Sequence, residues 1–263
     1  MSAIMAHAGL MMSQYDGDAL TLFTRFASPP SAVVKAKINT LIITLKLQGI
    51  WQLLDSLYVP AKVGEQTGGL CDWIRATESA TLASFSSWSN DYGFEAASGG
   101  IISTNYHPAN DATNLQRDNN CMFVWPTQLP NYTGGVGNHN IFVMSGVGQF
   151  RLGYQDTGLS RLSPVICNNA SIADTTTSLS VDELFAIGRN SSTNAHLFKG
   201  STILKTSATA STVIDTGASY DIKLLEVDPL TDNQGGVGVW GAGAYLDTTK
   251  LAALKAAIQA YMA

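Results

Sequence analysis

Glu226 and Asp228, in the segment EVDPL, are the nearest match in the sequence to a catalytic carboxylate pair. Alternate residues of a β-strand point to the same face. Retaining glycoside hydrolases use two carboxyl groups about 5–5.5 Å apart. Pro229 follows at once and is expected to end the strand. We therefore expect solvated carboxylates at a strand end and predict no catalytic residue there.

Other nucleophilic motifs are missing from the sequence. It lacks the Gly-x-Ser-x-Gly turn that exposes a catalytic serine. The histidines are scattered, without the spacing of a metalloprotease helix. His196 alternates in phase with Phe198, which favours a packed histidine over a ligand. We predict that the chain is not an enzyme.

A polar segment, NDATNLQRDNN at positions 110–120, is the best candidate for a cation site. Calcium prefers carboxylate and amide oxygens, so Asp111, Asp118 and Asn120 are candidate ligands. The segment does not have EF-hand spacing, and a loop that uses Asx turns explains the same residues. We expect no other cofactor.

A second polar segment, SFSSWSNDYGF, places two aromatic residues among serine, asparagine and aspartate. Carbohydrate sites often combine an exposed aromatic ring with such hydrogen-bonding groups. Trp88 and Tyr92 are therefore candidate glycan-binding residues. Packing of these rings against the core is the alternative.

The composition of the 263-residue chain favours an all-β protein with an uncharged polar surface. Hydrophobic residues make up 45% and charged residues 13%, against the usual ~25% charged. Turn-forming glycine is frequent, with 24 residues. The net charge of −5 and the lack of a basic cluster argue against a nucleic-acid partner.

The cysteines and the hydropathy of the sequence indicate the cellular compartment in which the chain is expected to fold. Cys71, Cys121 and Cys167 have no paired spacing, so we expect buried thiols and assembly in a reducing cytoplasm. The N-terminal segment lacks the basic start and continuous apolar core of a secretory signal. No run of 18 apolar residues occurs, so we expect no membrane insertion.

Hydrophobic periodicity divides the chain into three parts. Residues 1–30 are expected to form an N-terminal arm, and residues 31–59 a helical segment that opens at Pro30 or Ser31. Its apolar stripe is Val34, Ile38, Leu41, Ile42, Leu45 and Leu47. Short β-forming runs separated by turns fill most of residues 60–263, which predicts a β-sandwich. A helix capped by Asp247 or Thr248 closes the chain.

Several ordered segments resemble known families. The segment YLDTTKLAAL, residues 245–254, is similar to the closing segment of concanavalin A-like, laminin-G-like jelly rolls. The segment INTLIITLKLQGIWQLLDSLYV, residues 38–59, resembles a block of bacteriophage virion proteins that precedes such a sandwich. Residues 70–73, 93–108 and 118–125 resemble the blocks that follow, so the resemblance covers about residues 31–262.

This resemblance implies an all-β fold, an antiparallel jelly-roll sandwich with an N-terminal helical segment and a C-terminal helix. It implies a structural component of the virion, assembled in the host cytoplasm, that decorates or cements the capsid or associates with a tail fibre. The chain would dock through its N-terminal region onto other virion proteins, as a homo-oligomer or in a symmetric assembly. Two alternatives stay open: a carbohydrate-binding module for adsorption to a host-surface glycan and, last, a glycoside hydrolase.

Overall fold

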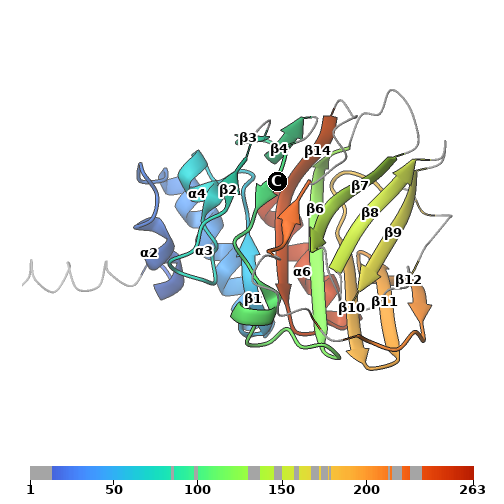
Figure 1. Cartoon of the computed structure of the whole chain (residues 1–263). Coiled ribbons are helices and arrows are strands. Elements are labelled where there is room, and N and C mark those ends of the chain that lie inside the picture. The colour runs from blue at the N-terminus through green and yellow to red at the C-terminus, as the bar shows by residue number, and fades with distance from the viewer. Residues whose placement is uncertain are drawn as a thin grey trace, which may run out of the picture.

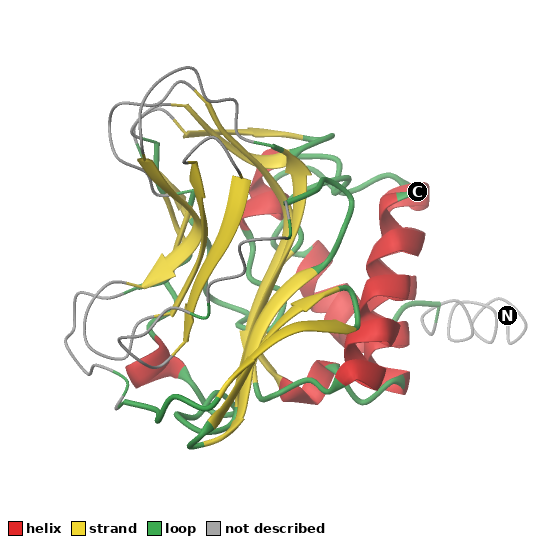
Figure 2. Cartoon of the chain, turned by 90° about the vertical axis from the view of Figure 1, so that its right-hand side faces the viewer, coloured by secondary structure: helices red, strands yellow, loops and turns green. Residues whose placement is uncertain are grey.

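The computed structural model describes residues 14–83, 86–97, 100–129, 137–144, 150–156, 160–166, 172, 177, 179–212, 214, 221–225 and 233–263. These residues form a β-sandwich, and most of the helices pack on one side of it, as Figure 2 shows. The helices are α2 (Gly17–Phe23), α3 (Ala32–Leu47), the 3-10 turn η1 (Trp51–Leu53), α4 (Gln66–Leu70), α5 (Pro108–Asp111) and α6 (Thr248–Met262).

The larger of the two antiparallel sheets has eight strands within the described part of the chain. Its order is β12 (Thr202–Ser207), β11 (Asn194–Lys199), β10 (Phe185–Ser191), β6 (Asn120–Gln128), β14 (Asn233–Gly243), β4 (Gly93–Ala97) and β3 (Ser86–Ser89). β1 (Leu54–Tyr58) pairs with the second half of β14, beyond the end of β4. Figure 1 shows these strands beside each other.

The smaller sheet has six described strands. Its order is β2 (Thr81–Leu82), β5 (Ile102–Ser103), β13 (Lys223–Leu224), β7 (Gly137–Met144), β8 (Phe150–Asp156) and β9 (Ser160–Ile166). Every pairing in both sheets is antiparallel. The structure thus confirms the predicted all-β antiparallel sandwich with helices at its N-terminal and C-terminal sides.

The larger sheet is the middle of three layers, because its central strands, such as β6 and β10, are buried on both faces. On β6, Met122 and Val124 face the core between the two sheets. Phe123 and Trp125 face a second core beneath the helices. Successive side chains of a strand point to opposite faces, so one strand supplies both cores.

Helices α3 and α6 form the third layer, and both begin where the sequence predicts. The Ser31 hydroxyl accepts a hydrogen bond from the Val34 amide, and the Asp247 carboxylate accepts one from the Lys250 amide. Gly49 follows α3 with φ of 62°, a conformation that glycine adopts without strain. Leu47, which we placed in the buried stripe of α3, is instead 80% exposed.

The structure corrects the predicted helical segment of residues 31–59. Leu54–Tyr58 is strand β1, in register with β14 through pairs such as Leu57 with Gly241. The spacing of Leu54, Leu57 and Tyr58 also fits a helix, which misled the prediction. All five residues of the strand are buried, so it shows no alternation of polar and apolar side chains.

The predicted N-terminal arm also differs from the structure, because residues 14–30 pack against their own chain. The Asp16 amide donates to the Asn39 side chain at 2.7 Å, and Lys46 forms ion pairs with Asp16 and Asp18. The Phe26 ring is buried in the core beneath the helices. Only residues 1–13 of the expected arm lie outside the described residues.

Two further expectations concern hydropathy and thiols. None of the helices in the described residues is both long and apolar enough to cross a membrane. Cys71 and Cys121 are buried free thiols, as predicted. Cys167 lies outside the described residues.

Two isoleucines of α3 test the importance of the helical layer. We expect Ile38→Ala to destabilise the protein by about 2–5 kcal/mol, because a fully buried side chain is removed and leaves a cavity. Ile43→Ala is the matched control on the same helix; since that side chain is 38% exposed, a change within about 0.5 kcal/mol is expected. Urea unfolding gives both values. Equal losses would contradict the assignment of the buried face.

Candidate functional site

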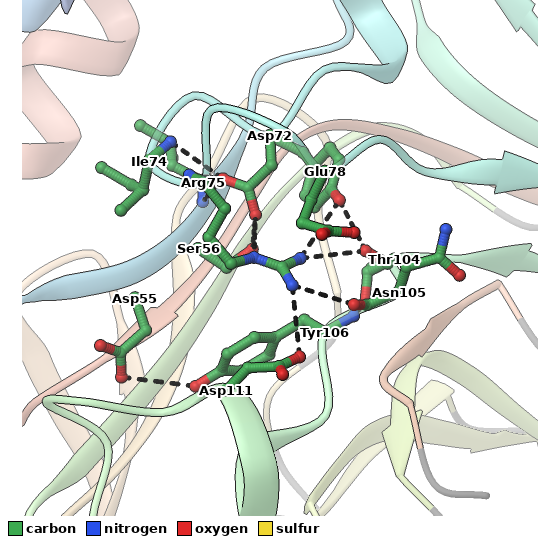
Figure 3. Close-up of polar contacts among 12 residues, drawn as sticks. Asp55, Ser56, Asp72, Ile74, Arg75, Glu78, Thr104, Asn105, Tyr106 and Asp111 are labelled. Carbon is green, nitrogen blue, oxygen red and sulfur yellow. Dashed lines mark hydrogen bonds and ion pairs between the residues drawn. The ribbon is translucent and has the colours of Figure 1, made fainter.

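The densest group of charged and phenolic side chains lies where β1 meets the loops before β2 and after β5 (Figure 3). Its centre is the Asp72 carboxylate, which is fully buried. Asp72 accepts hydrogen bonds from the Ser56 hydroxyl at 2.6 Å, from the amides of Leu57 and Ile74, and from Nε of Arg75 at 2.8 Å. These bonds fix the loop of residues 71–78 against β1.

Arg75 links Asp72 to the loop after β5. Its guanidinium donates to the carbonyl oxygens of Asn105 at 2.9 Å and Thr104 at 3.2 Å, and to the Asp111 carboxylate at 3.3 Å. It also lies over the Tyr106 ring, 5.1 Å from the centroid. Burial disfavours the charged guanidinium, but the neighbouring Asp72, Tyr58 and Asp111 together outweigh this effect, so the pKa of Arg75 is raised above its ordinary value.

Asp55 holds a third segment, residues 113–115, through hydrogen bonds to its carboxylate. Its carboxylate accepts hydrogen bonds from three successive backbone amides, those of Thr113, Asn114 and Leu115, the shortest being 2.6 Å. The Tyr106 hydroxyl donates to the same carboxylate at 3.4 Å. We call Asp55, Asp72, Arg75, Tyr58 and Tyr106, together with these contacts, the buried polar network.

Tyrosines beside carboxylates and an arginine could serve acid–base or nucleophilic chemistry, but this network is closed. Tyr58 and Tyr106 are fully buried, and the Tyr58 hydroxyl donates to the Thr104 carbonyl at 2.6 Å. Burial raises the pKa of both phenols, which keeps them protonated. The network therefore holds the loops in place and offers no open site to a substrate.

We expect Arg75→Met to cost about 3–5 kcal/mol of stability, because the substitution leaves the buried Asp72 carboxylate without its cationic partner. Adding Asp72→Asn is expected to recover part of the loss. Arg117→Met is the control, since Arg117 and Asp118 form an exposed pair worth about 0–1 kcal/mol. Chemical denaturation measures all three; a loss at Arg75 no larger than that at Arg117 would contradict this account.

The predicted calcium ligands have separate partners in the structure. The Asp111 carboxylate accepts from Arg75 and from the His107 amide. Asp118 pairs with Arg117 and accepts from the Ser211 hydroxyl. The Asn120 amide nitrogen donates to two backbone carbonyls. Among the described residues, no group of three or more histidine, cysteine, aspartate or glutamate side chains lies close enough to hold a metal ion.

The two predicted glycan residues lie on one hairpin but have different surroundings. The Trp88 ring packs against both cores, and its indole nitrogen donates to the Pro60 carbonyl at 2.7 Å. Trp88 is thus a packing residue. Tyr92, in the turn between β3 and β4, is 45% exposed. Of the two, Tyr92 has the more exposed ring, since Trp88 is partly buried against the cores.

The sequence also offered His196, Glu226 and Asp228 as residues to examine, and the structure describes the first of them. His196 is 6% exposed, its ring centroid lies 5.6 Å from that of Phe198, and its Nδ1 is 3.2 Å from the Thr206 hydroxyl oxygen. Burial lowers its pKa, so it is a packed histidine, as predicted. Glu226 and Asp228 lie outside the described residues.

Sequence reasoning missed an apolar groove between α3 and α6. It has a volume of about 560 Å³, within the range of about 300–1,000 Å³ typical of ligand pockets. Small side chains line much of it, namely Ala36, Thr40, Thr44, Ala253, Ala256, Ala257 and Ala260, and Lys37 is its one charged lining residue among the described residues. The alanine spacing of α6 was a usable signal, since it leaves a helix with little bulk on one side.

Large apolar side chains are exposed around this groove. Val33 at its rim is 68% exposed, and Leu47 near the end of α3 is 80% exposed. Ile43, also on α3, is 38% exposed. We call the groove and these three side chains the helical face.

A second depression, of about 530 Å³, lies over the loop that contains the calcium candidates. Apolar side chains of Pro108, Ala109, Ala112, Leu115 and Ile214 line it together with Gln116, Arg117 and Asp118. The apolar groups and the Arg117–Asp118 pair give it a mixed surface that suits a neutral polar ligand better than an ion.

Comparison with known proteins identifies the fold. No family model matches the chain, and no curated protein does. Similar solved structures include the binding domain of botulinum neurotoxin serotype D, with a TM-score of 0.54, 12% identity and coverage of 78% of this chain and 52% of that one. Trypanosoma rangeli sialidase in complex with sialic acid has a TM-score of 0.51 and 12% identity, with coverage of 83% and 38% respectively.

A mutant of the Trypanosoma rangeli sialidase that displays trans-sialidase activity is also similar, with a TM-score of 0.50 and 11% identity, covering 85% of this chain and 39% of that one. The chain thus spans about two fifths to one half of the structures that it matches. At this identity, the similarity shows the fold alone.

These matches correct one prediction. We expected from the missing motifs that the chain is not an enzyme, yet sialidases, which are enzymes, are among the proteins that share its fold. The prediction treated absent sequence motifs as an exclusion. Because enzymes also contain this fold, an enzymatic activity should not have been excluded.

Proposed function

We propose that the chain is a structural component of a bacteriophage virion that docks onto other virion proteins through its helical face. The observation that carries the proposal is the gathering of exposed apolar side chains around the groove between α3 and α6. Soluble monomers rarely expose contiguous apolar patches of more than a few hundred Å², and larger ones mark interaction sites.

Sequence and architecture support the same role. The segment that resembles bacteriophage virion proteins, residues 38–59, supplies most of α3 and all of β1. Helices α3 and α6 cover one side of the larger sheet, and the smaller sheet lies on its other side. A chain docked by its helices would therefore display the sandwich outward, in capsid decoration or on a tail fibre.

Two substitutions test the docking surface without disturbing the fold. Val33→Asp places an anion in the first turn of α3 and Leu47→Lys a cation in its last turn, both of which suit the helix dipole. We expect the double variant to enter purified particles at a copy number lower by about tenfold, since charge opposes burial of the patch. Quantitative mass spectrometry of the particles measures this.

Ile203→Lys is the matched control, because Ile203 is 42% exposed on strand β12, at the far edge of the larger sheet. Its copy number should equal that of the wild-type chain. If the wild-type chain is missing from the particles, the virion role is wrong. If the double variant enters the particles normally, the helical face is not the docking surface.

Glycan recognition is a second candidate function, and the exposed Tyr92 ring between Asn90, Asp91 and Gly93 favours it. Solved structures with this fold include a sialidase bound to sialic acid and a toxin receptor-binding domain. A decorating sandwich that binds a host-surface glycan would be compatible with the docking role.

For this candidate, we expect Tyr92→Ala to weaken binding on a glycan array by about tenfold, because aromatic packing is lost while the fold is kept. Ile203→Ala, at the opposite edge of the sheet, should bind like the wild type. Trp88→Ala is not a suitable control, because the partly buried Trp88 ring packs against both cores. A wild-type chain that binds no glycan on a broad array would remove this candidate.

A further inference from the structure

The exposed residues of helices α3 and α6 are all uncharged. On α3 they are Ala32, Val33, Ala36, Thr40, Ile43 and Leu47, and on α6 they are Thr248, Thr249, Ala252, Ala256, Gln259 and Ala260. A surface helix usually carries charged side chains on the side that faces water, and a helix that is apolar on all sides is buried. The outer surface of this helical layer therefore has the composition of a packed surface.

The lysines of these two helices lie at the margins of the outer surface, and all five are half-buried. Three of them form ion pairs within the chain: Lys46 with Asp16 and Asp18, Lys250 with Asp247, and Lys255 with Glu183. Carboxylates of the same chain therefore offset most of the positive charge. A second surface of the same composition can approach without strong repulsion.

The exposed residues of α3 also have the spacing of a helix-packing seam. Intervals of three, four, three and four residues separate Val33, Ala36, Thr40, Ile43 and Leu47. This is the heptad spacing through which the helices of a coiled coil pack side by side. The opposite stripe of α3 already packs in the core beneath the helices, so the seam is a second packing surface, and the partner that fits it is another helix.

The groove between α3 and α6 widens this seam. Val33, Ala36 and Thr40 belong to both, and alanines of α6 form the other wall of the groove. Packed helices lie about 8–10 Å apart, depending on the side chains at the contact. Side chains as small as these favour the shorter distance, so a partner helix can enter the groove and touch α3 and α6 together.

The seam is suited to a second copy of itself. Its largest exposed side chains, Val33 and Leu47, lie seven residues before and after Thr40. If two α3 helices run antiparallel about a two-fold axis at Thr40, each Val33 meets Leu47 of the other copy. A two-fold contact requires a surface that is complementary to itself in this way.

The remaining charge selects the antiparallel orientation. Lys37 is the one charged residue that lines the groove among the described residues. In a parallel pair it would lie beside Lys37 of the other copy, and like charges at an interface disfavour association. In the antiparallel pair it lies opposite the uncharged Ile43.

The area of the two helices matches that of a stable dimer. Helix α3 has 16 residues and α6 has 15. A helix rises about 1.5 Å per residue and is about 10–12 Å wide with its side chains, so the outward halves of both helices present about 800 Å². Stable protein–protein interfaces bury about 800 Å² on each partner.

We propose that the partner of the helical face is a second copy of this chain, whose α3 lies antiparallel to the first about a two-fold axis near Thr40. This inference rests on the proposed function, since it names the virion protein that covers the docking surface. The pair places the two sandwiches on opposite sides of a shared helical layer.

Light scattering of the full chain measures the association directly. Interfaces of this size have dissociation constants from micromolar to picomolar, so at about 50 μM we expect twice the chain mass of 27.9 kDa. Thr40→Glu places two carboxylates beside each other at the axis, which is expected to raise the dissociation constant about a hundredfold. Ala252→Glu is the matched control, since Ala252 is exposed on α6 but does not line the groove, and it should leave the dimer intact.

Disulfide cross-linking tests the axis and the orientation. A disulfide needs Cα atoms about 4.4–6.8 Å apart, so Thr40→Cys, at the axis, is expected to cross-link two copies quickly under mild oxidation. Val33→Cys is the control, because in the antiparallel pair its two copies lie about 21 Å apart along the helices. It should cross-link only when mixed with Leu47→Cys. The wild-type chain, in which Cys71 and Cys121 are buried, gives the background.

Three results would overturn the proposal: a wild-type chain that is monomeric at this concentration, a Thr40→Glu variant that stays dimeric, and Val33→Cys copies that cross-link with each other as quickly as Thr40→Cys copies do. In the variant that combines Val33→Asp with Leu47→Lys, the two new charges lie near each other across the pair. An exposed ion pair restores little of the lost apolar burial, so that variant is also expected to dimerise less.

Incorporation into particles is a separate measurement from dimerisation in solution. A monomeric chain that enters particles through its helical face would contradict this inference and keep the proposed function. A dimeric chain that is missing from particles would contradict the virion role and support the two-fold pairing of the helices.

Discussion

The architecture depends on the burial of strands β6 and β14 on both faces. Trp240 of β14 packs in the core between the sheets, whereas Val239 packs beneath the helices. A strand with apolar side chains on both faces must be covered twice, because each face left in water would lose its hydrophobic stabilisation. The helical layer is therefore part of the fold, and the sandwich is incomplete without it.

The buried polar network supplies hydrogen-bond acceptors to backbone amides at one end of the sandwich. The chain has few charges, at 13% of its residues, and several of them are used inside the protein. Asp55 and Asp72 each satisfy a group of backbone amides that no strand or helix would satisfy. Arg75 then balances the charge of Asp72. These side chains replace regular secondary structure where the loops cross between the two sheets.

The sequence predicted the parts of the fold that depend on local pattern. The helix starts at Ser31 and Asp247 were recognisable because a capping side chain precedes a stripe with helical spacing. Strand β1 was not, because burial on both faces removes the alternation that distinguishes a strand from a helix. The network was also missed, since Arg75 and its partners at positions 58, 105 and 111 are far apart in the sequence.

The pairing of β1 with β14 affects how the protein folds during its synthesis on the ribosome. Leu57 is synthesised before its partner Gly241, which lies far along the chain from it. Translation proceeds at about 5–20 residues per second, so α3 and β1 wait on the order of tens of seconds for the strand that they must pack against. Non-local pairing of this kind also slows folding itself. The larger sheet is therefore completed only after β14, its last strand in the sequence, has been synthesised.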